Sequence, residues 1–126
     1  MATPLLATLF PLILALAHGS VDFYLNIIQA LVPSLARHLD VPLSRVIILM
    51  GVVQFIANFI QPAAGWLMGK RNLAGILWAG TLLAILPAGM GLTHSFGIVA
   101  VLVILGAVGT GIFHPEGVVS LHQAAG

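Results

Sequence analysis

The stretch GAVGTGIFHPEG, residues 106–117, decides the fold, because it ends a long apolar run of the kind that crosses a membrane as a helix. His114, Pro115 and Glu116 follow one another in it. Proline lacks the N–H that would donate to the carbonyl of Gly111, and the glycine gives the proline ring room. A lost helical hydrogen bond beside ionisable groups is costly in lipid. Two interpretations follow: Glu116 reaches water at the helix end, or a bent helix carries His114 and Glu116 towards a polar cavity.

The composition of the whole chain also indicates a membrane protein. Of its 126 residues, 60% are hydrophobic and only 6% are charged, whereas soluble domains carry about 25% charged residues. Cysteine is absent, which excludes disulfides and cysteine metal sites. A formal net charge of +1 gives no reason to expect nucleic acid as a partner. We therefore predict an all-α membrane protein with about four spans of ~20 residues each.

Apolar segments and turn signals divide this single membrane domain, residues 1–126, into four predicted helices. They cover residues 4–37, 43–68, 73–92 and 96–121. The first would be ~50 Å long, so it must tilt, bend or protrude, and Pro11 and Pro33 are places to bend. The third is almost wholly apolar apart from Thr81, and we expect it to pack against other helices or to face lipid. Ala15 and Ala17 resemble a signal-peptide cleavage site, but no Lys or Arg precedes this apolar run, which favours a retained helix.

Three of the predicted helices carry polar residues along one face. Spacings of three and four, which place side chains on one side of a helix, relate His18, Asp22, Asn26 and Gln29 in the first, Gln54 and Asn58 in the second, and Thr110 and His114 in the fourth. Isolated polar residues in membrane helices often make only interhelical hydrogen bonds worth about 1 kcal/mol. Pure packing therefore stays open as an interpretation. We favour a shared aqueous or substrate-lined cavity, because three such faces would converge on it.

Asp22 is the carboxylate expected at mid-membrane, where a charge costs at least about 2.5–3.5 kcal/mol. Such a group is paired or protonated, and a proton-coupled carrier needs the protonated form. His18 lies one turn away and can share the proton. The histidines are otherwise scattered, and His114 and Glu116 face different ways on a helix, so we predict no metal site. With no protease signature, serine elbow or phosphate loop, we expect neither an enzyme nor a cofactor.

At these residues the sequence resembles the major facilitator superfamily, and most of all its branch that contains fosmidomycin-resistance proteins. HGSVDFY, residues 18–24, resembles the first-helix segment with its intramembrane aspartate. QPAAGWLMGKR, residues 61–71, resembles the end of the second helix and the loop signature G-x-L-x-D-R/K, which here falls on Gly65, Leu67, Gly69, Lys70 and Arg71. GIFHPEG, residues 111–117, resembles the fourth-helix motif and is the most specific of the three.

The resemblance implies a proton antiporter that exports a drug or another small molecule across the cytoplasmic (inner) membrane. It also implies that both termini and the Lys70–Arg71 loop are cytoplasmic. Charge alone does not decide orientation, because Arg37 and Arg45 in the first loop balance this pair. We further expect Glu116 to lie near Lys70 or Arg71. The implied partners are the lipid bilayer, protons, a small-molecule substrate and further membrane helices.

Two departures from the family pattern affect the functional prediction. Gly69 replaces the aspartate of the loop signature, and the family has twelve helices in two halves, of which this chain resembles about the first four. Two hypotheses remain. One is a transporter that is whole only as an assembly or is represented here by a fragment. The other is a truncated relative that serves as a non-transporting accessory subunit of a larger membrane complex. A reading frame that continues past Gly126 would favour the first, and a stop codon there the second.

Overall fold

The structure is a computed structural model, and it describes residues 4–68 and 74–125. In chain order its elements are α1 (Pro4–Ala30), α2 (Val32–His38), α3 (Leu43–Met68), α4 (Ala74–Ile85), the 3-10 helix η1 (Leu86–Leu92) and α5 (Phe96–Ala125). No strand occurs within these two ranges. The predicted all-α fold is therefore confirmed.

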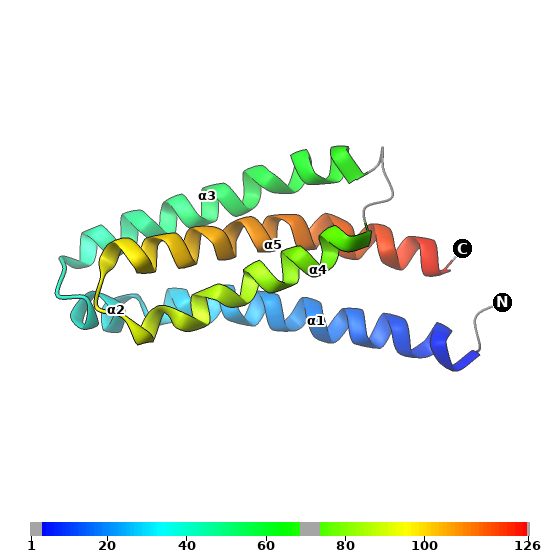
Figure 1. Ribbon diagram of the computed structural model, residues 1–126, viewed down its shortest axis with the longest axis horizontal. Coiled ribbons are helices and arrows are strands. Elements are labelled where there is room, and N and C mark those ends of the chain that lie inside the picture. The colour runs from blue at the N-terminus through cyan, green and yellow to red at the C-terminus, as the bar shows by residue number, and fades with distance from the viewer. Residues whose placement is uncertain (1–3, 69–73, 126) are drawn as a thin grey trace.

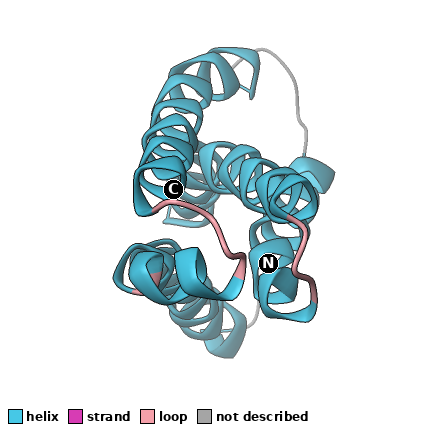
Figure 2. Ribbon diagram, turned by 90° about the vertical axis from the view of Figure 1, so that its left-hand side faces the viewer, coloured by secondary structure: helices cyan, strands magenta, loops and turns pink. Residues whose placement is uncertain are grey.

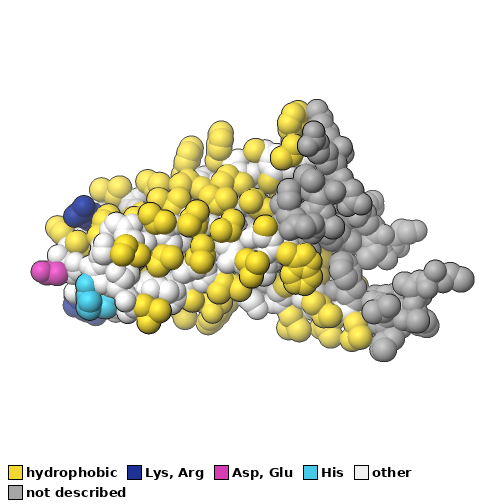
Figure 3. Space-filling view, viewed as in Figure 1, with side chains coloured by type: hydrophobic (Ala, Val, Ile, Leu, Met, Phe, Trp, Pro, Cys, Tyr) yellow, Lys and Arg dark blue, Asp and Glu magenta, His cyan; other side chains and the backbone are white. Residues whose placement is uncertain are grey.

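Three of the helices contain segments that are long and apolar enough to cross a membrane. These segments are Pro11–Ala30, Leu43–Leu67 and Phe96–Pro115, and a shorter apolar stretch covers Trp78–Leu92 in α4 and η1. Hydrophobic side chains cover most of the described surface in the view of Figure 3, whereas Arg, Asp and His side chains gather at the end where α2 lies. An apolar belt with charges at its edge is what a bilayer requires of a protein surface. The chain is a membrane protein.

The long helices run side by side as a bundle, and α5 lies at its centre (Figures 1 and 2). α5 packs extensively against α3 and α4 and less against α1. The contact with α4 is close, because a Cβ atom on Gly109 would lie 2.5 Å from the Gly80 carbonyl oxygen and from the Ala84 nitrogen. Such close contact is how membrane helices gain van der Waals energy. α4 therefore packs closely on α5, while Trp78 and Leu82 remain exposed on its surface.

Two apolar clusters hold the bundle together. The larger one joins α2, α3 and α5 and includes Val46 and Val99, whose side chains are fully buried. The smaller one brings Val21 of α1, Ala84 of α4 and Phe113 of α5 together. This second cluster fixes the position of α1 relative to the part of α5 that carries His114.

The helix predicted over residues 4–37 is divided at Leu31 in the structure. Pro33, near the start of α2, has no N–H to donate to the carbonyl four residues earlier, so one hydrogen bond of the helical ladder is missing at this point. The Leu31 N–H is shared between the carbonyls of Ile27 and Ile28, each at 3.1 Å. The chain is therefore able to change direction between α1 and α2.

The turn after α2 is a Schellman motif. The Val41 N–H donates to the Ala36 carbonyl at 3.1 Å and the Asp40 N–H to the Arg37 carbonyl at 3.3 Å. Asp40 has a φ of 51°, the left-handed conformation that this position requires and that aspartate tolerates better than most residues. The motif satisfies the last carbonyls of α2 and directs the chain into α3.

Candidate functional site

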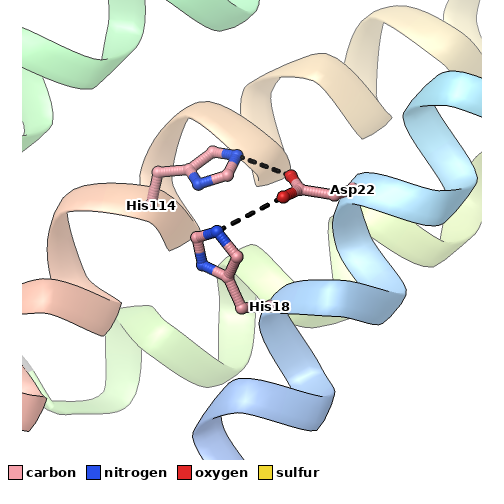
Figure 4. Close-up of side chains that lie close together, drawn as sticks. All are labelled: His18, Asp22 and His114. Atoms are coloured by element: carbon pink, nitrogen blue, oxygen red, sulfur yellow. Dashed lines mark ion pairs between the residues drawn. The ribbon is translucent and has the colours of Figure 1, made fainter.

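His18, Asp22 and His114 come together between α1 and α5 (Figure 4). The Asp22 Oδ2 atom lies 3.3 Å from His18 Nε2, and the Asp22 Oδ1 atom lies 3.3 Å from His114 Nε2. Each carboxylate oxygen thus faces a different imidazole. His18 reaches Asp22 because it lies one turn earlier on α1, whereas His114 reaches it across the helix interface.

The two imidazole rings also contact one another. Their centroids are 4.7 Å apart and their planes meet at 77°, an edge-to-face arrangement. The ring of Phe113, which is 1% exposed, lies 5.9 Å from that of His18. Because Phe113 belongs to the smaller apolar cluster, it holds this part of α5 against α1 and thereby positions His114.

The cluster is half-exposed on the surface of the described helices. The side chains of His18 and Asp22 are 44% and 43% exposed, and that of His114 is 22% exposed. A carboxylate that faces lipid within a membrane span is costly. The exposed side of the cluster therefore requires water, a bound cation or another helix.

The other polar residues of α1 and α3 have different surroundings. The Gln29 Nε2 donates to the Gln54 Oε1 at 3.3 Å, so the polar faces of the two helices meet at this pair. The Asn26 Nδ2 donates to the Asp22 backbone carbonyl at 2.7 Å, within α1. Asn26 and Asn58 are both exposed. The predicted site residues therefore form two separate groups, the cluster of His18, Asp22 and His114 and the pair of Gln29 and Gln54. Asn26 and Asn58 belong to neither group and lie on the surface.

The pocket into which Gln29, Gln54 and Thr110 face is narrow, whereas a larger one of about 280 Å³ lies between α1 and α4. The walls of the narrow pocket include Gln29, Gln54 and Thr110 among apolar side chains from α1, α3, α4, η1 and α5. Its volume of about 10 Å³ is the room that one water needs. The Thr110 hydroxyl already donates to the Gly106 carbonyl at 3.0 Å. A wider cavity along the polar faces therefore stays a prediction, and it requires helices beyond those described.

Two predicted bend positions in α5 lie at close contacts with α3. A Cβ atom on Gly111 would lie 2.8 Å from the Ala57 carbonyl oxygen. Pro115 faces Gly65, where an added Cβ would lie 3.4 Å from the proline Cβ. α5 continues past Pro115 to Ala125. In this region Gly111, Gly65 and Pro115 lie where α3 and α5 contact one another.

The remaining predicted site residues give less information. Leu67 is exposed at the end of α3. Gly69, Lys70 and Arg71 lie outside the described residues, and the description does not extend to the side chain of Glu116. The expected proximity of Glu116 to the two cations stays a prediction.

The sequence analysis missed a histidine pair at the α2 end of the bundle. His38 Nε2 lies 2.9 Å from the Thr93 carbonyl oxygen, and His94 Nδ1 lies 3.0 Å from the His38 carbonyl oxygen. The ring centroids are 4.2 Å apart. These contacts tie α2 to the turn before α5. One feature of the sequence could have indicated the pair. His38 and His94 both lie next to predicted helix ends, and those ends must lie on the same side of the membrane.

The fold and the cluster are those of a helical membrane protein that carries ionisable residues inside its spans. Ionisable residues inside the spans of a helical membrane protein usually mark ion and substrate pathways. Among known proteins, the chain is similar to the uncharacterized MFS-type transporter YfnC of Bacillus subtilis (strain 168), with 29% identity over 122 residues. The match covers 94% of this chain and 30% of YfnC, so the chain spans about a third of the length of that transporter.

This similarity supports a relationship to the major facilitator superfamily, the family that the abbreviation MFS denotes. It favours a transporter over an enzyme. It does not single out the fosmidomycin-resistance branch. No family model and no solved structure matches the chain.

Proposed function

We propose that this chain forms the first part of a small-molecule transporter, in which Asp22 takes up and releases a proton during antiport. The observation that carries the proposal is the position of Asp22 between His18 and His114, with 3.3 Å from each carboxylate oxygen to an imidazole nitrogen. An acidic side chain in a membrane span is costly unless it is paired or protonated. The similarity to an MFS-type transporter supports the same function.

The arrangement offers a link between proton binding and helix movement. His18 and Asp22 share α1, so their contact survives any rigid movement of that helix. His114 lies on α5, so its contact with Asp22 depends on how α1 and α5 are arranged. Protonation removes the negative charge of Asp22 and weakens its attraction to His114 across the interface. Transporters of this superfamily work by rocking bundles of helices against each other. Because protonation of Asp22 weakens its contact with His114, it would favour a different arrangement of α1 and α5 and so couple proton binding to that movement.

The proposal includes a location and a partner. The chain lies in the cytoplasmic (inner) membrane with both termini on the cytoplasmic side, and it exports a drug or another small molecule. Further membrane helices cover the exposed Asn26 and Asn58. They come from a second copy, from the remainder of a transporter or from a larger membrane complex. The hypothesis of a non-transporting accessory subunit is the alternative against which the proposal is tested.

The test measures proton-driven movement of fluorescent drug-like dyes in membrane vesicles that contain the protein with its native partners. We expect a pH gradient to drive dye uptake, and Asp22→Asn to abolish it without affecting membrane insertion. Asp40→Asn is the matched control, because this carboxylate lies in the turn after α2 and asparagine tolerates the same left-handed conformation. Unchanged uptake by the Asp22 variant would remove Asp22 from the mechanism. No uptake of any dye above empty vesicles would favour the accessory subunit.

A further inference from the structure

We propose that His18, Asp22 and His114 form a binding site for a divalent transition-metal ion such as zinc. Two imidazole nitrogens and one carboxylate oxygen converge here from α1 and α5 (Figure 4). These three ligand atoms all lie within 4.8 Å of one another. The sequence predicts no metal site, because it does not show that α1 and α5 bring these three residues together, and we revise that prediction here. Metal binding does not require that the chain transport anything, so the inference goes beyond the proposed function.

The spacing of the ligand atoms is close to that of a tetrahedral zinc site. Zinc binds imidazole nitrogen and carboxylate oxygen at about 2.0–2.2 Å, so two ligand atoms at the tetrahedral angle are roughly 3.3–3.5 Å apart. The two nitrogen–oxygen separations in the cluster are both 3.3 Å. These two separations belong to different carboxylate oxygens, and the three ligand atoms lie within 4.8 Å of one another, so side-chain rotation must bring one oxygen and both nitrogens closer together when the metal binds.

The chemical nature of the ligands selects the metal. Imidazole nitrogens suit zinc and its neighbours in the first transition series, whereas magnesium and calcium prefer sites made of oxygen atoms alone. Three protein ligands leave a fourth tetrahedral position for water or another ligand, as in zinc sites that exchange what they bind. The side chains of His18 and Asp22 are 44% and 43% exposed, so neither is enclosed by the described helices, and this open side leaves room for a fourth ligand.

A divalent cation would also compensate the negative charge of the Asp22 carboxylate. Two neutral imidazoles and one carboxylate carry a charge of −1 in a membrane-spanning region, where an uncompensated charge is costly. The cations whose side chains are described, Arg37 and Arg45, lie at the α2 end of the bundle, where α2 ends and α3 begins. A bound metal ion supplies the compensation at the carboxylate itself.

The experiment titrates Co²⁺ into the purified full chain in detergent, without a polyhistidine tag, and follows visible absorption. Because the chain has no cysteine, the spectrum reports nitrogen and oxygen ligands alone. We expect one Co²⁺ per chain, displaced by Zn²⁺, and at least a tenfold weaker affinity in His18→Gln, Asp22→Asn and His114→Gln. His94→Gln is the matched control, because it removes a histidine that lies at the other end of the bundle and should leave the affinity unchanged.

A second measurement separates lost ligands from lost folding. Zn²⁺ should raise the thermal unfolding temperature of the wild-type chain and of the His94 variant but not that of the three cluster variants. Equal Co²⁺ affinity in the wild-type chain and the cluster variants would overturn the inference, as would loss of binding only in the His94 variant. Metal binding without dye transport would support this inference and contradict the proposed function, and transport without metal binding would do the reverse.

Discussion

The side-chain amide of Gln29 donates a hydrogen bond of 3.3 Å to the side-chain oxygen of Gln54, and this bond links α1 directly to α3. Both helices pack mainly against α5 rather than against each other. At the glutamine pair, the polar faces of two otherwise apolar helices therefore satisfy part of each other's hydrogen-bonding capacity. Interhelical hydrogen bonds of this kind contribute about 0.6–2 kcal/mol in membrane proteins.

The first prediction concerns this glutamine pair. Gln54→Leu should lower the free energy of unfolding in detergent by about 1 kcal/mol, because the Gln29 amide loses its partner. Gln29→Leu should cost a similar amount, and the double variant should cost less than the sum of the two. A double-mutant cycle measured by denaturant unfolding checks this. Strict additivity would mean that the bond contributes nothing.

The second prediction concerns the contact between α4 and α5. Gly109→Ala should lower stability by about 1–3 kcal/mol, because the new methyl group would collide with backbone atoms of Gly80 and Ala84. Gly51→Ala is the matched control, because an added Cβ there has nothing within 4 Å. It should be neutral or stabilising by up to about 1 kcal/mol, since alanine favours helix. Thermal unfolding of both variants decides; equal destabilisation would contradict the close packing.

The third prediction concerns the histidine pair at the α2 end. A carbonyl oxygen only accepts hydrogen bonds, so His38 must carry its proton on Nε2 and His94 on Nδ1. Nitrogen-15 NMR of labelled histidine side chains at neutral pH, assigned with His38→Gln and His94→Gln, should show these two different tautomers. The same tautomer at both rings would mean that one of the two contacts is absent in solution.

The fourth prediction concerns orientation in the membrane. α1 begins and α5 ends at the same end of the bundle, away from the turns that contain Asp40 and Ser95 (Figure 1). Because the chain lacks cysteine, single cysteines at 40, 72 and 95 can be probed with an impermeant thiol reagent in intact cells. We expect labelling at 40 and 95 and none at 72. Labelling at 72 alone would reverse the proposed orientation.

The fifth prediction concerns association with other helices. Asn26 and Asn58 are exposed on helices that span the membrane. The Asn26 amide donates one hydrogen bond, to the Asp22 backbone carbonyl, which leaves the rest of its hydrogen-bonding capacity to be satisfied. Polar groups that face hydrocarbon without a partner cost several kcal/mol each. We expect the chain purified in mild detergent to have a mass above that of a monomer. Photocrosslinkers at 26 and 58 should capture the covering helices, whereas one at the apolar, exposed Phe59 should not. A monomer that forms no crosslinks would contradict this.

The proline residues show how far the fold follows from sequence. The apolar runs predict membrane helices because bilayer thickness sets their length. Pro33 was recognisable as a place to bend, and in the structure it separates α1 from α2. Pro62 and Pro115 lie inside α3 and α5, which continue through them. The same residue type thus ends one helix and lies inside two others, and sequence periodicity does not predict which outcome occurs at which proline.

The candidate site was predictable in part for a similar reason. The contact between His18 and Asp22 follows from a spacing of four on one helix. The addition of His114 depends on which helix packs beside α1, and the apolar contacts of Val21, Ala84 and Phe113 determine that. The pair of His38 and His94 lies at helix ends and turns, where no periodic pattern exists. Long-range side-chain contacts therefore came from the structure alone.

The 3-10 winding of η1 increases the length of the apolar segment formed by α4 and η1. A 3-10 helix rises ~2.0 Å per residue against ~1.5 Å in an α-helix. The 12 residues of α4 and the 7 of η1 therefore extend about 32 Å, whereas the same residues wound as one α-helix would extend about 28 Å. The hydrocarbon core of a typical bilayer is ~30 Å thick. The 3-10 winding thus lengthens the segment by about 3–4 Å, so that it spans the full thickness of the core without thinning the lipid around it.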